Sequence, residues 1–319
     1  MEHTAGSDHW LIAAARTGAR YHYRHKAPWR HNLIGVAVLV VVALGIAGLI
    51  AIQAAADRWA LVPVIGVALG LCYYTLLGIP VHEASHGMMF LSRDAGRRKR
   101  WNTAIGWACA LPFGIHYRRH WAEGHVTHHI HPLEDDDPQA FNRLTGRPLL
   151  FVLALLLLVP GAALVHRFTV KRPTGYGGSS TGVFAAFAAI WSLVLVGSTV
   201  AWGAKVAVAL AYGLQVLAAL NQLKGALEHG GEIAFDPDRL LRSRSSMFPL
   251  RALLPMFFVT IYHFEHHLNY AVPWYDLPRY HRDIYRLVPA DLRPAIFNAE
   301  LYAQLAGEKG TIPRAASLP

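Results

Sequence analysis

Four long apolar runs, arranged as two pairs, dominate the pattern of hydrophobic and polar positions along the chain. The first pair covers residues 33–56 and 59–80 and is interrupted only by Asp57-Arg58. The second pair covers residues 183–200 and 205–220, with a short turn between them. Because a helix rises about 1.5 Å per residue, runs of this length are able to cross about 30 Å of hydrocarbon. The pattern predicts two transmembrane hairpins, over residues 32–80 and 182–221.

A fifth apolar stretch, residues 149–168, departs from this pattern. Pro160-Gly161 interrupts it, and basic residues flank it on both sides. If it crossed the membrane, the last polar region would lie on the opposite face from the earlier ones. We therefore expect a kinked helix at the membrane interface over residues 148–172, because proline breaks a helix and basic flanks suit an interfacial position.

These elements predict an all-α integral membrane protein, built as a single domain over residues 1–319. It has four transmembrane helices, interfacial helices and a polar cap made of residues 1–31, 81–147 and 222–319. Several arginines and Lys26 precede the first run, whereas the turn at Asp57-Arg58 carries one charge of each sign. By the positive-inside rule, both termini and the polar cap are expected on the cytoplasmic side.

Composition supports this class and excludes others. The chain is 54% hydrophobic and 16% charged, which is too apolar for a soluble protein of this length. The net charge of +10 comes from residues beside the apolar runs, so we expect membrane lipid and not nucleic acid as the partner. The two cysteines, Cys72 and Cys109, lie within apolar runs, which argues against a disulfide framework or a thiolate metal site.

Nine of the 19 histidines fall in short clusters at the predicted cytoplasmic boundary. The segment VHEASHG holds the first pair one helical turn apart, and HVTHH and HFEHH each place three histidines on one helical face. One more histidine lies in LEHGG. The nine are His82, His86, His125, His128, His129, His229, His263, His266 and His267. So many imidazoles at a membrane boundary predict metal coordination, and nine ligands are too many for one zinc ion.

VHEASHG also matches H-E-x-x-H, the signature of zinc metalloproteases. An intramembrane protease needs a third, acidic ligand on a later membrane helix, and the later apolar runs contain no such motif. A non-catalytic metal-binding membrane protein is a further alternative, because it could use the same histidines without a substrate channel.

The histidine boxes, together with YHFEHHLNYAVPWYDLPRYH and HWAEGHVTHHIHPLEDDDP, resemble the membrane-bound fatty acid desaturase superfamily. The resemblance covers residues 76–286 and implies two non-haem iron ions bound by the nine histidines. It further implies an O₂-dependent oxidoreductase that acts on a long-chain acyl lipid or fatty acid, most simply by introducing a C=C bond. Hydroxylation and oxidative decarboxylation to a terminal alkene are alternatives that the same ligand set supports.

Carboxylates beside the boxes are expected to orient imidazole N–H groups and to offset metal charge. These carboxylates are Glu83, Glu228, Glu265 and Asp137. His116 and His120 form a further H-x-x-x-H pair, for which contact with metal and a surrounding role both stay open. His131, His166 and His281 are expected to be structural.

Electrons must come from an external donor, because the chain has no flavin fingerprint, no Fe–S cysteine spacing and no haem domain. The basic cytoplasmic face suggests a ferredoxin-like carrier, and the apolar helices suggest a lipid or fatty acyl substrate that enters between them.

Overall fold

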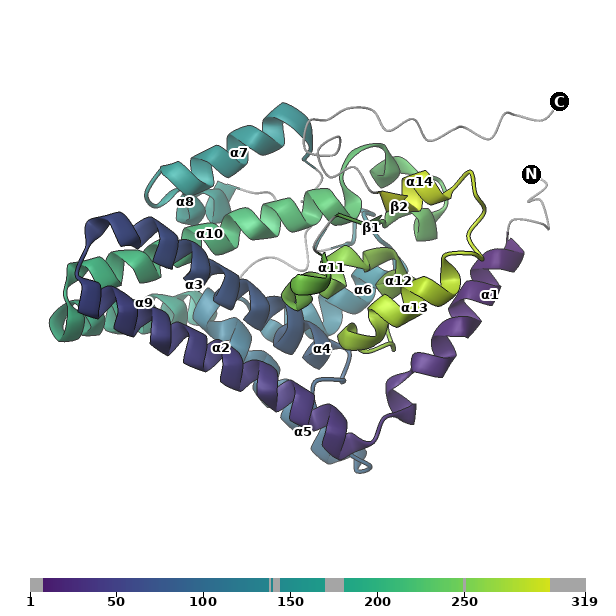
Figure 1. Cartoon of the computed structure of the whole chain (residues 1–319), viewed down its shortest axis with the longest axis horizontal. Coiled ribbons are helices and arrows are strands. Elements are labelled where there is room, and N and C mark those ends of the chain that lie inside the picture. The colour runs from purple at the N-terminus through teal and green to yellow at the C-terminus, as the bar shows by residue number, and fades with distance from the viewer. Residues whose placement is uncertain (1–7, 138, 140–143, 170–180, 249–250, 299–319) are drawn as a thin grey trace.

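The computed structural model describes residues 8–137, 139, 144–169, 181–248 and 251–298, and these are almost entirely helical. Figure 1 shows long helices that extend to one side of a cap of short helices. The helices are α1 Asp8–Gly18, α2 Pro28–Ala56, α3 Val62–Leu76, α4 His82–Ser85, α5 Ala95–Ala110, α6 Gly124–Ile130, α7 Gly146–Leu158, α8 Ala162–Thr169, α9 Thr181–Trp202, α10 Ala204–His229, α11 Phe258–Ile261, α12 His263–Leu268, α13 Leu277–Ile284 and α14 Arg293–Ile296. Two short strands, β1 Ser245–Ser246 and β2 Phe297–Asn298, pair in parallel.

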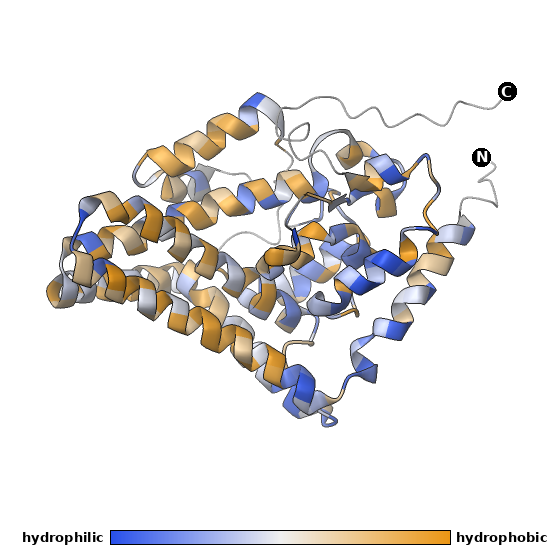
Figure 2. Ribbon diagram, viewed as in Figure 1, coloured by the Kyte–Doolittle hydropathy of each residue, from blue (hydrophilic) through white to orange (hydrophobic). Residues whose placement is uncertain are grey.

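The prediction of four membrane-crossing helices is confirmed. Within the described residues, the helices long and apolar enough to cross a membrane are Pro28–Ala56, Trp59–Ser85, Thr181–Trp202 and Ala204–His229. The second of these runs from α3 through α4, so it delivers the first histidine pair at its end. Figure 2 shows the long helices as mostly hydrophobic and the cap as more polar. The chain is an integral membrane protein.

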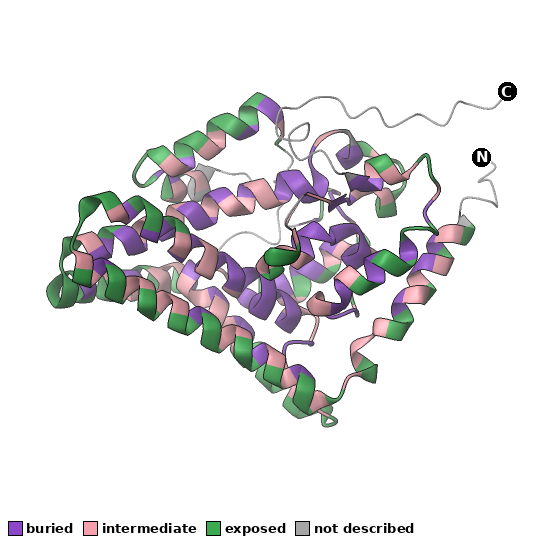
Figure 3. Cartoon of the chain, viewed as in Figure 1, coloured by how far each residue is buried: buried purple, intermediate pink, exposed green. Residues whose placement is uncertain are grey.

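The inner and outer helices of this bundle differ in burial. Only 11% of the apolar window of α2 and 17% of that of α9 are buried, against 50% for the helix that contains α3 and 56% for α10. The α3–α10 pair therefore forms the centre of the bundle, and α2 and α9 turn large apolar surfaces outward, as a lipid environment requires. Figure 3 shows the same contrast, with buried residues concentrated in α10 and the cap.

Small residues allow α3 and α10 to approach closely. A Cβ atom at Gly66 would lie 2.4 Å from the Tyr212 ring, and one at Gly70 would lie 2.4 Å from Val216. Membrane helices use such small residues because lipid provides no hydrophobic force to drive them together. At the far end of the bundle, Lys205 Nζ lies 2.7 Å from Asp57 Oδ1 and joins the turns of the two hairpins.

The fifth apolar stretch differs from its prediction. It is not one kinked helix over residues 148–172 but two helices, α7 and α8, separated by a break at Val159-Pro160-Gly161. The two helices pack against α10, with α7 lying beside it in Figure 1. Gln215 of α10 closes the turn, because its side chain accepts a hydrogen bond from Gly161 N at 2.6 Å and donates one to the Leu156 carbonyl at 3.3 Å. The described part of 148–172 ends at residue 169.

Outside the bundle, the short helices pack into a second core. The Tyr280 hydroxyl of α13 donates to the Ala14 carbonyl of α1 at 2.9 Å, and Phe264 of α12 lies fully inside this core. The core positions α12 so that His263 lies 2.8 Å from His229 at the end of α10. The cap thereby brings the third histidine box to the end of the membrane bundle.

Candidate metal centre

Four segments from both halves of the chain converge where the bundle meets the cap. They are α4 with the residue directly after it, α6, the end of α10, and α12. A π-helical turn directly precedes both α4 and α6, over Leu77–Val81 and Tyr117–Glu123. Wider turns of this kind rotate the next helix and occur often at functional sites. They set which face of α4 and of α6 carries the histidines.

The structure brings all nine predicted histidines together, mostly as two groups of four. The first group, cluster A, comprises His82, His86, His125 and His266. The second group, cluster B, comprises His128, His229, His263 and His267. Within each cluster, one ring nitrogen from every residue lies within 4.8 Å of the others. Each cluster joins segments that are far apart in sequence, so only the fold assembles it.

His129 lies between the two clusters. Its Nε2 is 3.2 Å from Nε2 of His125 in cluster A. Its ring centroid is 4.6 Å from that of His266 in cluster A and 4.3 Å from that of His267 in cluster B. His129 could thus bind an ion in either cluster.

In cluster B, acceptors on the outer side of the rings fix where the ring protons lie. Nδ1 of His128 donates to Asp137 Oδ2 at 2.8 Å, and Nδ1 of His229 donates to the Arg242 carbonyl at 2.7 Å. In the neutral rings, Nε2 then carries a lone pair. Nε2 of His229 nevertheless lies 3.1 Å from Nε2 of His128 and 2.8 Å from Nε2 of His263. Lone pairs that converge this closely repel one another unless a cation lies among them.

Several buried ring nitrogens also have no hydrogen-bond partner among the described residues. They are Nδ1 of His82, Nε2 of His86, Nδ1 of His129 and Nε2 of His267. Buried polar atoms without partners are costly, so their concentration at one site indicates a place for an electrophile such as a metal ion. Imidazole is a good ligand for zinc, copper, iron and nickel. The donor set therefore fits two transition-metal ions.

Burial favours the neutral form of most of these imidazoles, which is the form that binds metal. It lowers the pKa of His86 to about 3. It also lowers the pKa well below the usual value for five further histidines, His125, His129, His263, His266 and His267.

Asp137 and Glu228 are the carboxylates that reach the histidines. Although burial alone would raise the pKa of Asp137, the interaction with His128 holds that pKa below its usual value. Oε1 of Glu228 lies 3.4 Å from Nδ1 of His263, and its Oε2 lies 2.5 Å from Lys224 Nζ. Asp137 is positioned to orient the His128 ring. Nδ1 of His263 instead donates to the Val259 carbonyl at 3.3 Å, so Glu228 is placed only to offset positive charge.

Glu83 and Glu265 behave differently. Glu83 is 1% exposed. Its carboxyl group interacts with the Trp274 backbone, and no described residue forms a full hydrogen bond with it. Glu265 turns away from the clusters, because it accepts short hydrogen bonds from Ser245 Oγ and from Nδ1 of His281. Among the described residues, no hydrogen bond or ion pair joins Glu265 to a clustered histidine, so its predicted role beside the metal has no support.

The other histidines lie outside both clusters. His120 and His166 line a cavity, as does His116, whose Nδ1 accepts from Arg119 N at 3.3 Å. His131 pairs with Asp136 at 2.9 Å on the surface. The sequence left open whether His116 and His120 touch metal, and the structure places them in the cavity wall.

Sequence reasoning missed three side chains that contact the histidines or their carboxylates, namely Trp121, Tyr270 and Lys224. The buried Trp121 ring lies 5.6 Å from His82 and 5.2 Å from His125. The Tyr270 ring, 52% exposed, stacks on His86 at 5.2 Å. Trp121 is four residues before His125 and Lys224 four before Glu228, so helical spacing could have indicated both contacts. No sequence signal indicated the contact of Tyr270.

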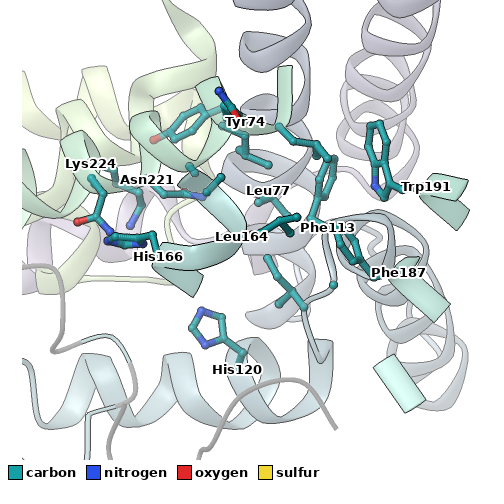
Figure 4. A pocket seen from close by; sticks show the side chains of 18 of the residues that line it. Tyr74, Leu77, Phe113, His120, Leu164, His166, Phe187, Trp191, Asn221 and Lys224 are labelled. Carbon is teal, nitrogen blue, oxygen red and sulfur yellow. The ribbon is translucent and has the colours of Figure 1, made fainter. Parts of the chain in front are cut away.

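A cavity of about 400 Å³ runs alongside α10 and ends beside cluster A (Figure 4). None of the nine histidines lines it, and Trp121 and Gln139 stand between the cavity and cluster A. Its wall inside the bundle is apolar and includes Leu164, Phe187, Trp191, Leu195, Ala211 and Leu214. Its other end is lined by Asn221, Lys224, His116, His120 and His166.

The family model described as Fatty acid desaturase matches residues 57–297, more than half of the chain. This range contains all nine clustered histidines and the cavity. No curated protein matches the sequence.

Proposed function

Because the chain belongs to the fatty acid desaturase family, we propose that it is an O₂-dependent di-iron oxidoreductase that introduces a C=C bond into an acyl chain. The observation that carries the proposal is the convergence of nine imidazoles, eight of them in two clusters, beside one end of a largely apolar cavity. Family membership and two clusters made only of histidine both speak against the zinc protease. Hydroxylation and oxidative decarboxylation share the first hydrogen abstraction with desaturation and differ in the fate of the resulting carbon radical.

The ligands of the two ions would be the nine histidines, four from each cluster and His129. Iron held there would supply the O₂ activation that removes hydrogen from an unactivated C–H bond. The protein holds the imidazoles in place: the Asp137 carboxylate and the Arg242 carbonyl each fix one ring and its tautomer. The buried cap keeps bulk water from the reacting atoms, which limits side reactions.

The cavity is suited to the acyl chain. Its apolar walls come from α8, α9 and α10 within the membrane bundle, and its polar end lies at the level of the metal clusters. A chain lying in it would pass Trp121, whose side chain contacts both the cavity and cluster A. The position of the Trp121 ring would then determine which carbons of the acyl chain approach the clusters.

Desaturation consumes O₂, two substrate hydrogens, two protons and two electrons, and it yields two water molecules. We infer that the two electrons come from a small acidic carrier such as a ferredoxin, which docks on the basic cytoplasmic face. Exposed Arg24 and the half-buried Arg98 lie near Tyr270, because Tyr23 N donates to the Ala271 carbonyl at 3.0 Å and the Arg98 guanidinium lies over the Tyr23 ring. The exposed ring of Tyr270 on His86 gives such a carrier a short route to cluster A.

The proposal is tested by expressing the protein in a bacterial host and measuring iron content together with lipid products by mass spectrometry. We expect about two iron ions per chain and a new double bond, since nine imidazoles exceed what one ion binds. His128→Ala and His266→Ala should each abolish the product. His131→Ala, which alters a surface histidine outside both clusters, is the matched control and should leave the product unchanged.

One zinc ion without iron would contradict the proposal, as would turnover by purified enzyme with O₂ and substrate but no reductant. A hydroxylated product, or an alkene one carbon shorter than the substrate, would keep the di-iron oxidoreductase and replace desaturation by the corresponding alternative reaction.

A further inference from the structure

We propose that the cavity along α10 binds a lipid with one chain and an anionic head group, and that Arg119 recognises the head. This inference rests on the proposed function only in treating the cavity ligand as the substrate. It names the class of substrate, which family membership does not.

The charges that line the cavity all have the same sign. Its described lining residues include two cations, Arg119 and Lys224, and the three imidazoles of His116, His120 and His166, but neither Asp nor Glu. Lys224 is already neutralised by Glu228 at 2.5 Å. Among the described lining residues, Arg119 is therefore the cation left for a ligand to neutralise.

Arg119 is exposed, and in the described part of the chain no carboxylate pairs with its guanidinium. Its neighbour Arg118 provides the contrast, because its Nε lies 2.7 Å from Glu123 Oε1 and it does not line the cavity. A guanidinium binds a carboxylate or phosphate through two parallel hydrogen bonds. Arg119 is thus available for an anion at the polar end of the cavity.

The rest of the cavity is long enough to hold an acyl chain. Its lining residues on α10 extend from Lys224 to Ala211, which corresponds to roughly 20 Å along a helix. Figure 4 shows Phe113, Phe187, Trp191 and Leu164 around this space, with Lys224, Asn221, His166 and His120 toward its other side. A volume of about 400 Å³ is near the lower end for ligand pockets, which favours one chain over the two of a diacyl phospholipid.

The closing experiment measures binding without turnover. The purified, metal-loaded protein is placed in phosphatidylcholine nanodiscs at pH 8 without O₂ or reductant. It is titrated with palmitate, lysophosphatidate, palmitoyl-CoA and hexadecanol. We expect at least one anionic ligand to bind about tenfold more tightly than hexadecanol, in keeping with one charge-assisted hydrogen-bonded pair.

Two arginine variants locate the head group. Arg119→Gln should remove the roughly tenfold advantage of the anionic ligand and leave the affinity for hexadecanol unchanged. Arg118→Gln, the matched control, should keep that advantage. The anionic ligand that binds most tightly identifies whether the head is a free carboxylate, a phosphate or a carrier thioester.

Equal affinity for hexadecanol and all three anionic ligands would overturn the proposal, and so would an equal loss in both arginine variants. Because the titration involves no chemistry, a missing oxidised product would count against the proposed function alone. Conversely, an oxidised neutral lipid together with no effect of Arg119→Gln would refute only the head-group assignment.

Discussion

At the scale of single residues, the partner on one ring nitrogen of an imidazole fixes the tautomer and leaves the other nitrogen free to bind a metal. Asp137 shows this most clearly, because it accepts from Nδ1 of His128 and from the backbone N–H groups of Leu133 and Gln139. These contacts fix the carboxylate, which in turn fixes the ring. The lone pair on Nε2 then points toward cluster B whether or not a metal is bound.

Asp137→Asn should weaken iron binding in cluster B by about 10- to 100-fold, because the amide is a weaker acceptor and no longer offsets positive charge. Competition with a chelator, combined with iron analysis, measures this change. Asp136→Asn alters the carboxylate that pairs with surface His131 and is the control. Equal iron retention in the two variants would show that the hydrogen bond from His128 has no part in metal binding.

At the scale of elements, the α7–α8 hairpin depends on one polar side chain within the membrane bundle. Its turn breaks the helical hydrogen bonds at Pro160-Gly161, and exposed backbone groups are unfavourable beside lipid. Gln215 satisfies groups on both sides of this break. Since α8 also forms part of the cavity wall, the stability of the hairpin bears on the shape of the cavity.

Gln215→Leu should destabilise the hairpin by about 1–3 kcal/mol, because it leaves the Gly161 N–H without a partner. Hydrogen exchange should accelerate over residues 146–169, while α3 and α10 keep their protection. Thr199→Val is a control within α9, since the exposed Thr199 hydroxyl bonds only within its own helix at 2.7 Å. Unchanged exchange in Gln215→Leu would mean that packing alone holds the hairpin.

At the scale of the whole molecule, the bundle and the cap provide different parts of the site. The bundle provides the largely apolar part of the cavity, which extends along α10 to Ala211 and along α9 to Leu195, whereas the cap provides most of the histidines at the other end. For an acyl chain bound as proposed, the distance between the two ends would limit chain length. Because Arg119 and Trp121 lie in one helical turn, the carbons next to the head group would then lie nearest cluster A.

Ala211→Trp should shift the products toward shorter acyl chains, because the indole fills the far end of the cavity. We expect a loss of about tenfold or more for the longest substrates, since small misfits in apolar pockets cost about 1–3 kcal/mol. Mass spectrometry of products from mixed chain lengths measures the shift. Val208→Trp changes a residue of α10 that is 42% exposed and outside the cavity, so it should leave chain length unaltered.

Much of this architecture could be predicted from sequence because its signals are local. Apolar runs of membrane length indicated four spanning helices, and spacings such as His125, His128 and His129 put side chains on one helical face. Glu265 shows the limit of such reasoning. It stands beside two clustered histidines in sequence, yet helical geometry turns it toward Ser245 and His281.

The sequence by itself determined the membrane-spanning bundle, the all-helical class and the set of histidines, because hydropathy and helical period act over neighbouring residues. Only the tertiary structure decided which histidines share a cluster, that His129 lies between them, and that α7 and α8 turn back along α10. It also decided that His120 belongs to the cavity wall. These arrangements depend on contacts between residues up to 184 positions apart, such as His82 with His266, which no local pattern in the sequence encodes.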